Sequence, residues 1–192
     1  MSNIEENEIT VRVTCSKEGI VNILKNEGFT EEKSFTLDDY FFIPNNIDIK
    51  TYSVREILSK AVIVRYIVNG ERIDQKITFK EKDINEKGEV VRQKSINCSI
   101  LDINEAKNLL NALGYHEIMN IKEKDIIYCK NNFKLILKFM DNRKPLIEIE
   151  TNSEYNTIEK LKDKLKEIKL PIEQNTYFVK KAEEELSRIL NI

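Results

Sequence analysis

Apolar and polar residues alternate strictly along residues 8–13, whose sequence is Glu-Ile-Thr-Val-Arg-Val. A period of two residues predicts a β-strand with one apolar face. The opposite face carries Glu8, Thr10 and Arg12. Polar faces of antiparallel sheets commonly meet water. The pattern therefore leaves open whether these three side chains are solvated or line an enclosed surface.

Further strand-like stretches lie at 38–44, 61–68, 73–80, 89–100, 125–129, 133–139 and 146–151. Asn69-Gly70 separates two of them and is typical of a tight hairpin, because both residue types readily adopt positive φ angles. Residues 81–88 are charged and predict a loop.

Amphipathic helices are predicted at 16–28, 102–114, 158–168 and 177–190, with a short helical turn at 53–60. Ser16 and Asp102 suit the start of the first two helices, and Gly28 and Gly114 suit their ends. Each of these two helices follows a strand and precedes an aromatic strand, which indicates a weak internal repeat. No Gly- or Pro-rich linker divides residues 1–192. The pattern predicts one α+β domain dominated by antiparallel strands, with two similar halves.

Composition narrows the function classes. The 31 basic and 33 acidic residues nearly cancel to a net charge of −2, which gives no bulk signal for nucleic acid or an anionic membrane surface. The acidic start lacks a signal-peptide core and no run has transmembrane length, so we expect a cytoplasmic protein. Cys15, Cys98 and Cys129 lack metal-ligand spacing and are expected to be small buried thiols. The lone His116 supports no hydrolase arrangement, and no catalytic residue is assigned.

Basic side chains gather on the polar faces of the predicted strands. They are Arg12, Arg65, Lys76, Lys80, Arg92, Lys94, Lys134 and Lys138, and the acids among them are Glu8, Glu148 and Glu150. An open sheet would expose these groups, whereas a barrel with helices packed outside would enclose them. Enclosed charges need partners. In that case the basic residues suit a polyanion such as phosphate, and the glutamates suit a divalent cation.

Five motifs occur in a familiar order. They are Glu8-x-Thr10-x-Arg12, the aromatic strand at 38–44, Arg65 in a Val-Ile-Val-Arg strand, Thr78-x-Lys80, and Glu148-x-Glu150. This order resembles the CYTH superfamily, the triphosphate tunnel metalloenzymes, over nearly the whole chain. The resemblance implies an eight-stranded antiparallel tunnel that binds triphosphate with the eight basic residues. It also implies Mg²⁺ or Mn²⁺ at Glu8, Glu148 and Glu150. Class IV adenylate cyclases, thiamine triphosphatases and inorganic triphosphatases form this group.

Several positions depart from the family pattern. Thr10 replaces a glutamate, the strand of Arg92 and Lys94 lacks its two acids, and Lys138 stands where an acid is expected. Glu123 and Asp125 replace a basic pair. Because several of these changes reverse charge, they indicate a rearranged site, and the remaining acids favour one metal ion rather than two.

Three functions follow from these patterns. The first is a metal-dependent enzyme that hydrolyses or cyclises ATP, thiamine triphosphate or inorganic triphosphate. The second is a tunnel that binds a phosphorylated ligand without turnover, and the third is a protein-interaction scaffold. As an alternative to a metal site, Glu148 and Glu150 would pair with Lys134 and Lys138 across strands. The sequence does not choose among the ligands, and it leaves the oligomeric state open, a homodimer included.

Overall fold

A computed structural model describes residues 8–84, 90–174, 177 and 179–192, apart from the side chains of residues 82–93. Its strands are β1 (Glu8–Arg12), β2 (Thr30–Pro44), β3 (Val62–Asn69), β4 (Arg72–Ile84), β5 (Val90–Ser99), β6 (Tyr115–Lys130), β7 (Phe133–Met140) and β8 (Leu146–Glu150). Its helices are α1 (Lys17–Asn26), α2 (Val54–Ser59), α3 (Ile103–Ala112), α4 (Ile158–Ile168) and α5 (Lys181–Leu190).

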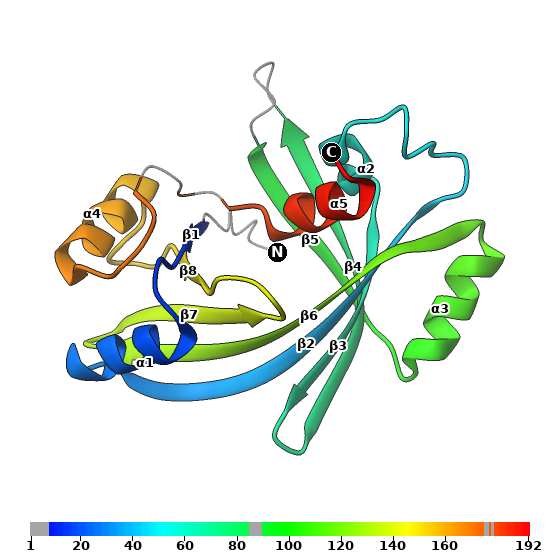
Figure 1. The fold of residues 1–192 in the computed structure, drawn as a ribbon. Coiled ribbons are helices and arrows are strands. Elements are labelled where there is room, and N and C mark those ends of the chain that lie inside the picture. The colour runs from blue at the N-terminus through cyan, green and yellow to red at the C-terminus, as the bar shows by residue number, and fades with distance from the viewer. Residues whose placement is uncertain (1–7, 85–89, 175–176, 178) are drawn as a thin grey trace. The chain divides into compact units, whose positions relative to one another are not determined.

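All eight strands belong to one antiparallel sheet in the order β1-β8-β7-β6-β2-β3-β4-β5 (Figure 1). The α+β class and the eight antiparallel strands expected from the sequence are therefore confirmed. The strand–helix–strand order also occurs twice, as β1-α1-β2 and as β5-α3-β6. Closure of the sheet into a barrel stays a prediction.

The chain forms two compact units. Unit 1 includes residues 37–122 and 181–192, and unit 2 includes residues 6–36 and 123–180. In unit 1, Asp102 caps the start of α3. Its side chain accepts hydrogen bonds from two backbone amides of the first turn. In unit 2, Ser16 caps α1 by accepting from the amide of Gly19. The predicted cap residues are thus confirmed in each unit.

The core of unit 2 lies on one face of β1, β6, β7 and β8. The apolar phase of these strands packs against the apolar sides of α1 and α4, as their alternating and helical periods predict. Its most buried members are Ile9, Val11, Val13, Ile20, Leu24, Tyr128, Leu135, Leu137, Ile147, Ile149, Leu161 and Leu165. The other face of the same strands carries the charged residues.

One hydrophobic cluster of unit 1 lies beneath α3. Ala106 and Leu110 of α3 pack with Phe42 of β2 and Val64 of β3, and Figure 1 shows α3 alongside these strands. The short helix α2 packs against α5, and a salt bridge of 3.0 Å joins Arg55 to Glu183 between the two helices.

The ends of three strands differ from the predicted ones. β2 begins at Thr30 and β6 at Tyr115, each well before the predicted start. β4 continues to Ile84, so the prediction of a loop from residue 81 is wrong over residues 81–84. Residues 85–89 of that predicted loop lie outside the described residues. Polar residues in strand ends do not produce the apolar alternation that would reveal them.

The last helix begins at Lys181 rather than at residue 177. The reason is a backbone interaction with β1. The amide of Thr10 donates to the carbonyl of Tyr177, and the amide of Val179 donates to the carbonyl of Thr10. These bonds hold Tyr177 and Val179 alongside a strand, so their backbone groups are not available to a helix.

Two smaller points complete the fold. Cys98 is exposed, whereas Cys15 and Cys129 are partly buried, so the expectation of three buried thiols is wrong. Cys98 lies in β5, which is the last strand in the order of the sheet. Within the described residues, no helix combines the length and the apolar character needed to cross a bilayer.

Candidate functional site

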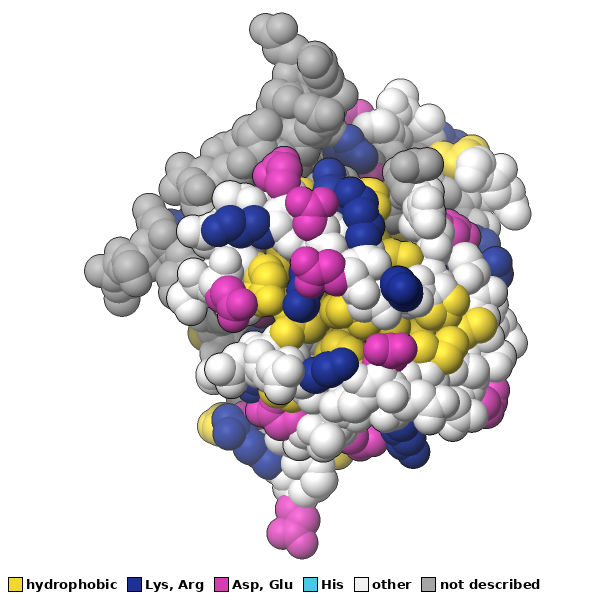
Figure 2. Space-filling view, turned by 90° about the vertical axis from the view of Figure 1, so that its left-hand side faces the viewer, with side chains coloured by type: hydrophobic (Ala, Val, Ile, Leu, Met, Phe, Trp, Pro, Cys, Tyr) yellow, Lys and Arg dark blue, Asp and Glu magenta, His cyan; other side chains and the backbone are white. Residues whose placement is uncertain are grey.

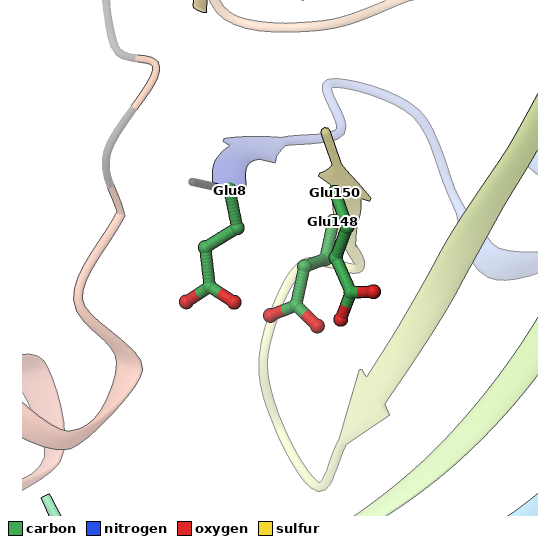
Figure 3. Close-up of side chains that lie close together, drawn as sticks. All are labelled: Glu8, Glu148 and Glu150. Carbon is green, nitrogen blue, oxygen red and sulfur yellow. The ribbon is translucent and has the colours of Figure 1, made fainter. Parts of the chain in front are cut away.

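Three glutamates of unit 2 converge on the charged face of β1 and β8. Glu8 pairs directly opposite Glu150, and Thr10 pairs opposite Glu148. Directly opposite residues of antiparallel strands share a face, so the register brings all three carboxylates to one side (Figure 3). One carboxylate oxygen from each lies within 4.8 Å of the other two. Among the described residues, this is the only group of three potential metal ligands with such spacing.

The donor set of these glutamates fits a hard divalent cation. Mg²⁺ prefers oxygen ligands at about 2 Å, so two ligands on opposite sides of the ion lie about 4 Å apart. Mn²⁺ also suits carboxylate ligands. Glu150 is exposed and Glu8 and Glu148 are only partly buried, so small side-chain rotations would close the set around one ion.

Lys138 of β7 lies beside this group and is almost completely buried. Its ammonium donates to Asp125 Oδ2 at 2.9 Å. The same Nζ lies 3.2 Å from Glu148 Oε1 and 3.7 Å from Glu123 Oε1. Glu123 and Asp125 are themselves buried. Unit 2 therefore contains a buried lysine among three carboxylates.

These carboxylates determine the protonation of Lys138. Burial alone would lower the pKa of Lys138, because a low-dielectric environment penalises the charged form. The charges of Glu148, Glu123 and Asp125, with the hydrogen bond to Asp125, outweigh burial and raise the pKa above its ordinary value of 10.5. Lys138 is consequently a permanent cation at neutral pH.

Two other predicted basic residues of unit 2 also contact acids. Arg12 forms a 3.1 Å salt bridge with Glu173. Lys134 is exposed and lies 2.7 Å from Glu32 Oε1. The alternative cross-strand pairing is thus present for Lys138 with Glu148, whereas the carboxylate that the structure pairs with Lys134 is that of Glu32.

A second charged cluster lies in unit 1 around Asp39 of β2. Arg65 of β3 donates to both Asp39 oxygens, through Nε at 2.5 Å and Nη2 at 2.6 Å. The Asp39 side chain is 1% exposed and that of Arg65 is 18% exposed. Such a two-point contact fixes the guanidinium in one orientation.

Asp39 is ionised because of the cations around it. Burial alone raises the pKa of a carboxyl group. The hydrogen bonds and charge of Arg65, with the charges of Lys181 and Lys80, outweigh burial and lower the pKa of Asp39 below 3.8. Three basic side chains of unit 1 therefore act on one buried carboxylate. We call Arg65, Lys80 and Lys181 the basic set of unit 1.

The strand register places the other predicted basic residues of unit 1. Lys76 lies directly opposite Arg65, so it shares the face of Arg65 and Lys80. Lys94 lies opposite Glu81. It therefore belongs to the other face of the β4–β5 pair, and the register does not bring it together with Lys80. The side chain of Arg92 lies outside those that the structure describes.

The surface view agrees with the nearly balanced charge of the chain. Basic and acidic side chains are interspersed on the face drawn in Figure 2, with hydrophobic side chains between them. Among the residues coloured there, neither sign of charge forms a continuous field of the kind that attracts nucleic acid.

Comparisons with known proteins address the fold. No family model matches the chain, and no curated protein sequence matches it. A Pyrococcus horikoshii OT3 protein superimposes with a TM-score of 0.70 at 18% identity, over 95% of this chain and 99% of that chain. A proposed adenylate cyclase from Vibrio parahaemolyticus gives a TM-score of 0.58 at 12% identity, over 97% of this chain and 98% of that chain.

A second proposed adenylate cyclase, from Bacillus halodurans, gives a TM-score of 0.51 at 16% identity, over 90% of this chain and 97% of that chain. The fold resembles that of proposed adenylate cyclases. This likeness agrees with the class of fold expected from the sequence, and membership of the CYTH superfamily stays a prediction. Identities this low concern the fold alone.

Sequence reasoning missed two residues of the charged clusters. Asp39 lies in the buried phase of β2 with Leu37 and Phe41, and an acid in a buried phase is a signal that a cation lies nearby. Lys181 belongs to a helix far along the chain, and no local pattern relates it to Asp39. The first could have been found from the sequence, but the second required the structure.

Proposed function

We propose that this protein binds a triphosphate-containing small molecule and one divalent cation, Mg²⁺ or Mn²⁺. The convergence of Glu8, Glu148 and Glu150 on one face of unit 2 is the observation that carries the proposal. The likeness of the fold to proposed adenylate cyclases supports the choice of ligand, because the substrate of such an enzyme is a nucleoside triphosphate.

Charged side chains of each unit suit one kind of ligand group. In unit 2, Glu8, Glu148 and Glu150 would hold the cation, which when bound neutralises phosphate charge. In unit 1, taken by itself, Arg65, Lys80 and Lys181 offer donors to an anion such as phosphate. Asp39 holds the Arg65 guanidinium in place, so little side-chain freedom is lost when Arg65 binds an anion.

Turnover of the ligand, by hydrolysis or by cyclisation, is the activity we propose to test. Wild-type protein is incubated with ATP, thiamine triphosphate or inorganic triphosphate, with Mg²⁺ or Mn²⁺, and assayed for released phosphate and for cyclic nucleotide. We expect one of the three compounds to be consumed only when the metal is present. Metal-independent turnover, or no turnover together with no binding, would contradict the proposal.

Two variants test the cation site in the same assay. Glu8→Gln and Glu150→Gln each remove a carboxylate charge with little change of shape, so we expect weaker Mn²⁺ binding and loss of the metal-dependent activity. Glu159→Gln is the matched control, because Glu159 is an exposed glutamate of α4 in the same unit. Full Mn²⁺ binding by both site variants would exclude these glutamates as ligands.

A second candidate function is binding of a phosphorylated ligand without turnover. The contact of Lys138 with Glu148 favours it, because a carboxylate that neutralises an ammonium is a weaker ligand for a metal ion. A binding protein would show a higher melting temperature with triphosphate, by mass action, and no product in either assay. This result separates the second candidate from the first.

A further inference from the structure

The buried ammonium of Lys138 lies among three carboxylates, whose oxygens are not all within 4.8 Å of one another as those of Glu8, Glu148 and Glu150 are. Lys138 lies directly opposite Asp125 across β6 and β7, and Glu123 is two residues from Asp125 on the same face of β6. On the other side, Glu148 of β8 lies 3.2 Å from the same Nζ. Carboxylates from two flanking strands therefore surround one cationic centre on the strand between them.

The same oxygens are of the kind that a hard divalent ion takes. Mg²⁺ and Mn²⁺ are bound by carboxylates, and an ammonium offers three donors to such acceptors. The Lys138 side chain is 7% exposed, and those of Glu123 and Asp125 are 1% and 2% exposed. Buried carboxylates require a cation close by, and here the chain itself provides that cation.

We propose that the Lys138 ammonium takes the place of a divalent ion among Glu123, Asp125 and Glu148. It thereby limits the charged face of unit 2 to the one divalent ion that Glu8, Glu148 and Glu150 would hold. The count of one ion in the wild type rests on the proposed function, whereas the role of Lys138 rests on its own contacts.

The proposal predicts that removal of this ammonium creates a metal site. In Lys138→Met the side-chain length is nearly kept and the charge is lost, so Glu123, Asp125 and Glu148 lose the ammonium that they share. We expect this variant to bind one more Mn²⁺ per chain than the wild type binds. A lysine with only a packing role would leave the number of bound Mn²⁺ ions unchanged.

Bound Mn²⁺ is counted from the electron paramagnetic resonance signal of free Mn²⁺ during titration of the metal-free protein. Lys138→Arg keeps the charge and should bind the same number of ions as the wild type. Lys134→Met is the matched control, because Lys134 lies on the same strand and face but is exposed. This control should also match the wild type.

Thermal unfolding supplies the second readout. Mn²⁺ should raise the melting temperature of Lys138→Met by more than that of the wild type, because only the variant gains a site in its folded state. If the variant does not fold in metal-free buffer, it is refolded from urea with Mn²⁺ present, and we expect the metal to restore a cooperative transition. Failure of Mn²⁺ to restore folding would overturn the proposal.

Variants that also carry two substitutions in the proposed cation site separate this proposal from the proposed function. Glu8→Gln with Glu150→Gln removes two ligands of the first site and leaves the surroundings of Lys138 in place. If the wild type binds no Mn²⁺ and Lys138→Met binds one, the proposed cation site is wrong and the role of Lys138 stands. If Lys138→Met binds no more ions than the wild type, with and without the two Gln substitutions, the role of Lys138 is wrong.

Discussion

The two units contain opposite arrangements of buried charge. In unit 1 the buried acid Asp39 is acted on by the cations Arg65, Lys80 and Lys181. In unit 2 the buried base Lys138 lies among three carboxylates. Both units use strands with one apolar and one charged face, and each contains a helix that ends before a glycine with positive φ, Gly28 at 81° and Gly114 at 82°.

The comparison shows how one local architecture supports two kinds of binding. A lone acid orients the bases around it, and those bases retain donors for an anion. A lone base neutralises part of a group of acids, and the acids retain oxygens for a cation. A cluster with one acid among bases therefore suits an anion, and a cluster with one base among acids suits a cation. Four predictions test this comparison.

The largest expected effect is the loss of stability in Lys138→Met without metal. Removing the ammonium leaves buried carboxylates without their main cation, and removal of one member of a buried ion pair costs about 3–5 kcal/mol. We expect a loss of that size in the free energy of unfolding, measured by urea denaturation in buffer with a chelator. A loss as small as that of an exposed lysine would contradict the arrangement of charges in unit 2.

Asp39→Asn is the corresponding change in unit 1, and its effect should be smaller. The amide oxygen can still accept one hydrogen bond from Arg65, and the Arg65 side chain reaches solvent. Loss of a charged acceptor costs about 1–3 kcal/mol. Urea denaturation of this variant beside Lys138→Met gives the order directly, and the reverse order would show that the two clusters are not comparable.

The pH dependence of the free energy of unfolding tests the role of Asp39. Because the folded protein lowers the pKa of Asp39 below 3.8, the unfolded chain binds this proton more readily. Ionised Asp39 therefore contributes stability above pH 3.8, and this contribution is lost as the pH falls through the lower folded pKa. The stability difference between the wild type and Asp39→Asn should narrow as denaturation is measured from pH 6 toward pH 3. A constant difference would contradict the lowered pKa.

The smallest effect on stability is expected for substitution of Lys134, which serves as an exposed control for the buried Lys138. Its contact with Glu32 lies at the surface, and water screens such pairs. Lys134→Met should unfold at the same urea concentration as the wild type, within experimental error. A clear loss of stability would mean that burial is not what separates Lys138 from Lys134.

The sequence was sufficient to locate the strands, but not to predict all of their ends or the contacts between charges. Apolar phases such as Ile9 with Val11, and Leu135 with Leu137, follow directly from a period of two and lie in the core. A phase assigns a polar residue to a face, but its partner depends on register. The apolar phase of β7 excludes a shift of one residue, but a shift of two residues would keep the faces and separate Lys138 from Asp125.

The convergence of Glu8, Glu148 and Glu150 was expected only through a resemblance to a family, because strands that far apart in sequence give no local sign of pairing. Lys181 could not be predicted for the same reason. It lies in the last helix of the chain, yet its charge lowers the pKa of Asp39, which lies far away in the sequence. The extra lengths of β2 and β6 were missed for a different reason. The first residues of β2 are largely exposed and polar, so neither propensity nor periodicity distinguishes them from a loop.

The register of β1 with β8 also has a consequence for the order of folding. Hairpins such as β6–β7 join neighbours in the chain and close short loops, whereas Glu8 and Glu150 meet only when the intervening chain has been brought together. Contacts of such long separation carry the greatest loop-closure entropy and are expected to form late. A cation that binds across these two strands would then report completion of unit 2, and the rate at which Mn²⁺ is captured during refolding would time its final step.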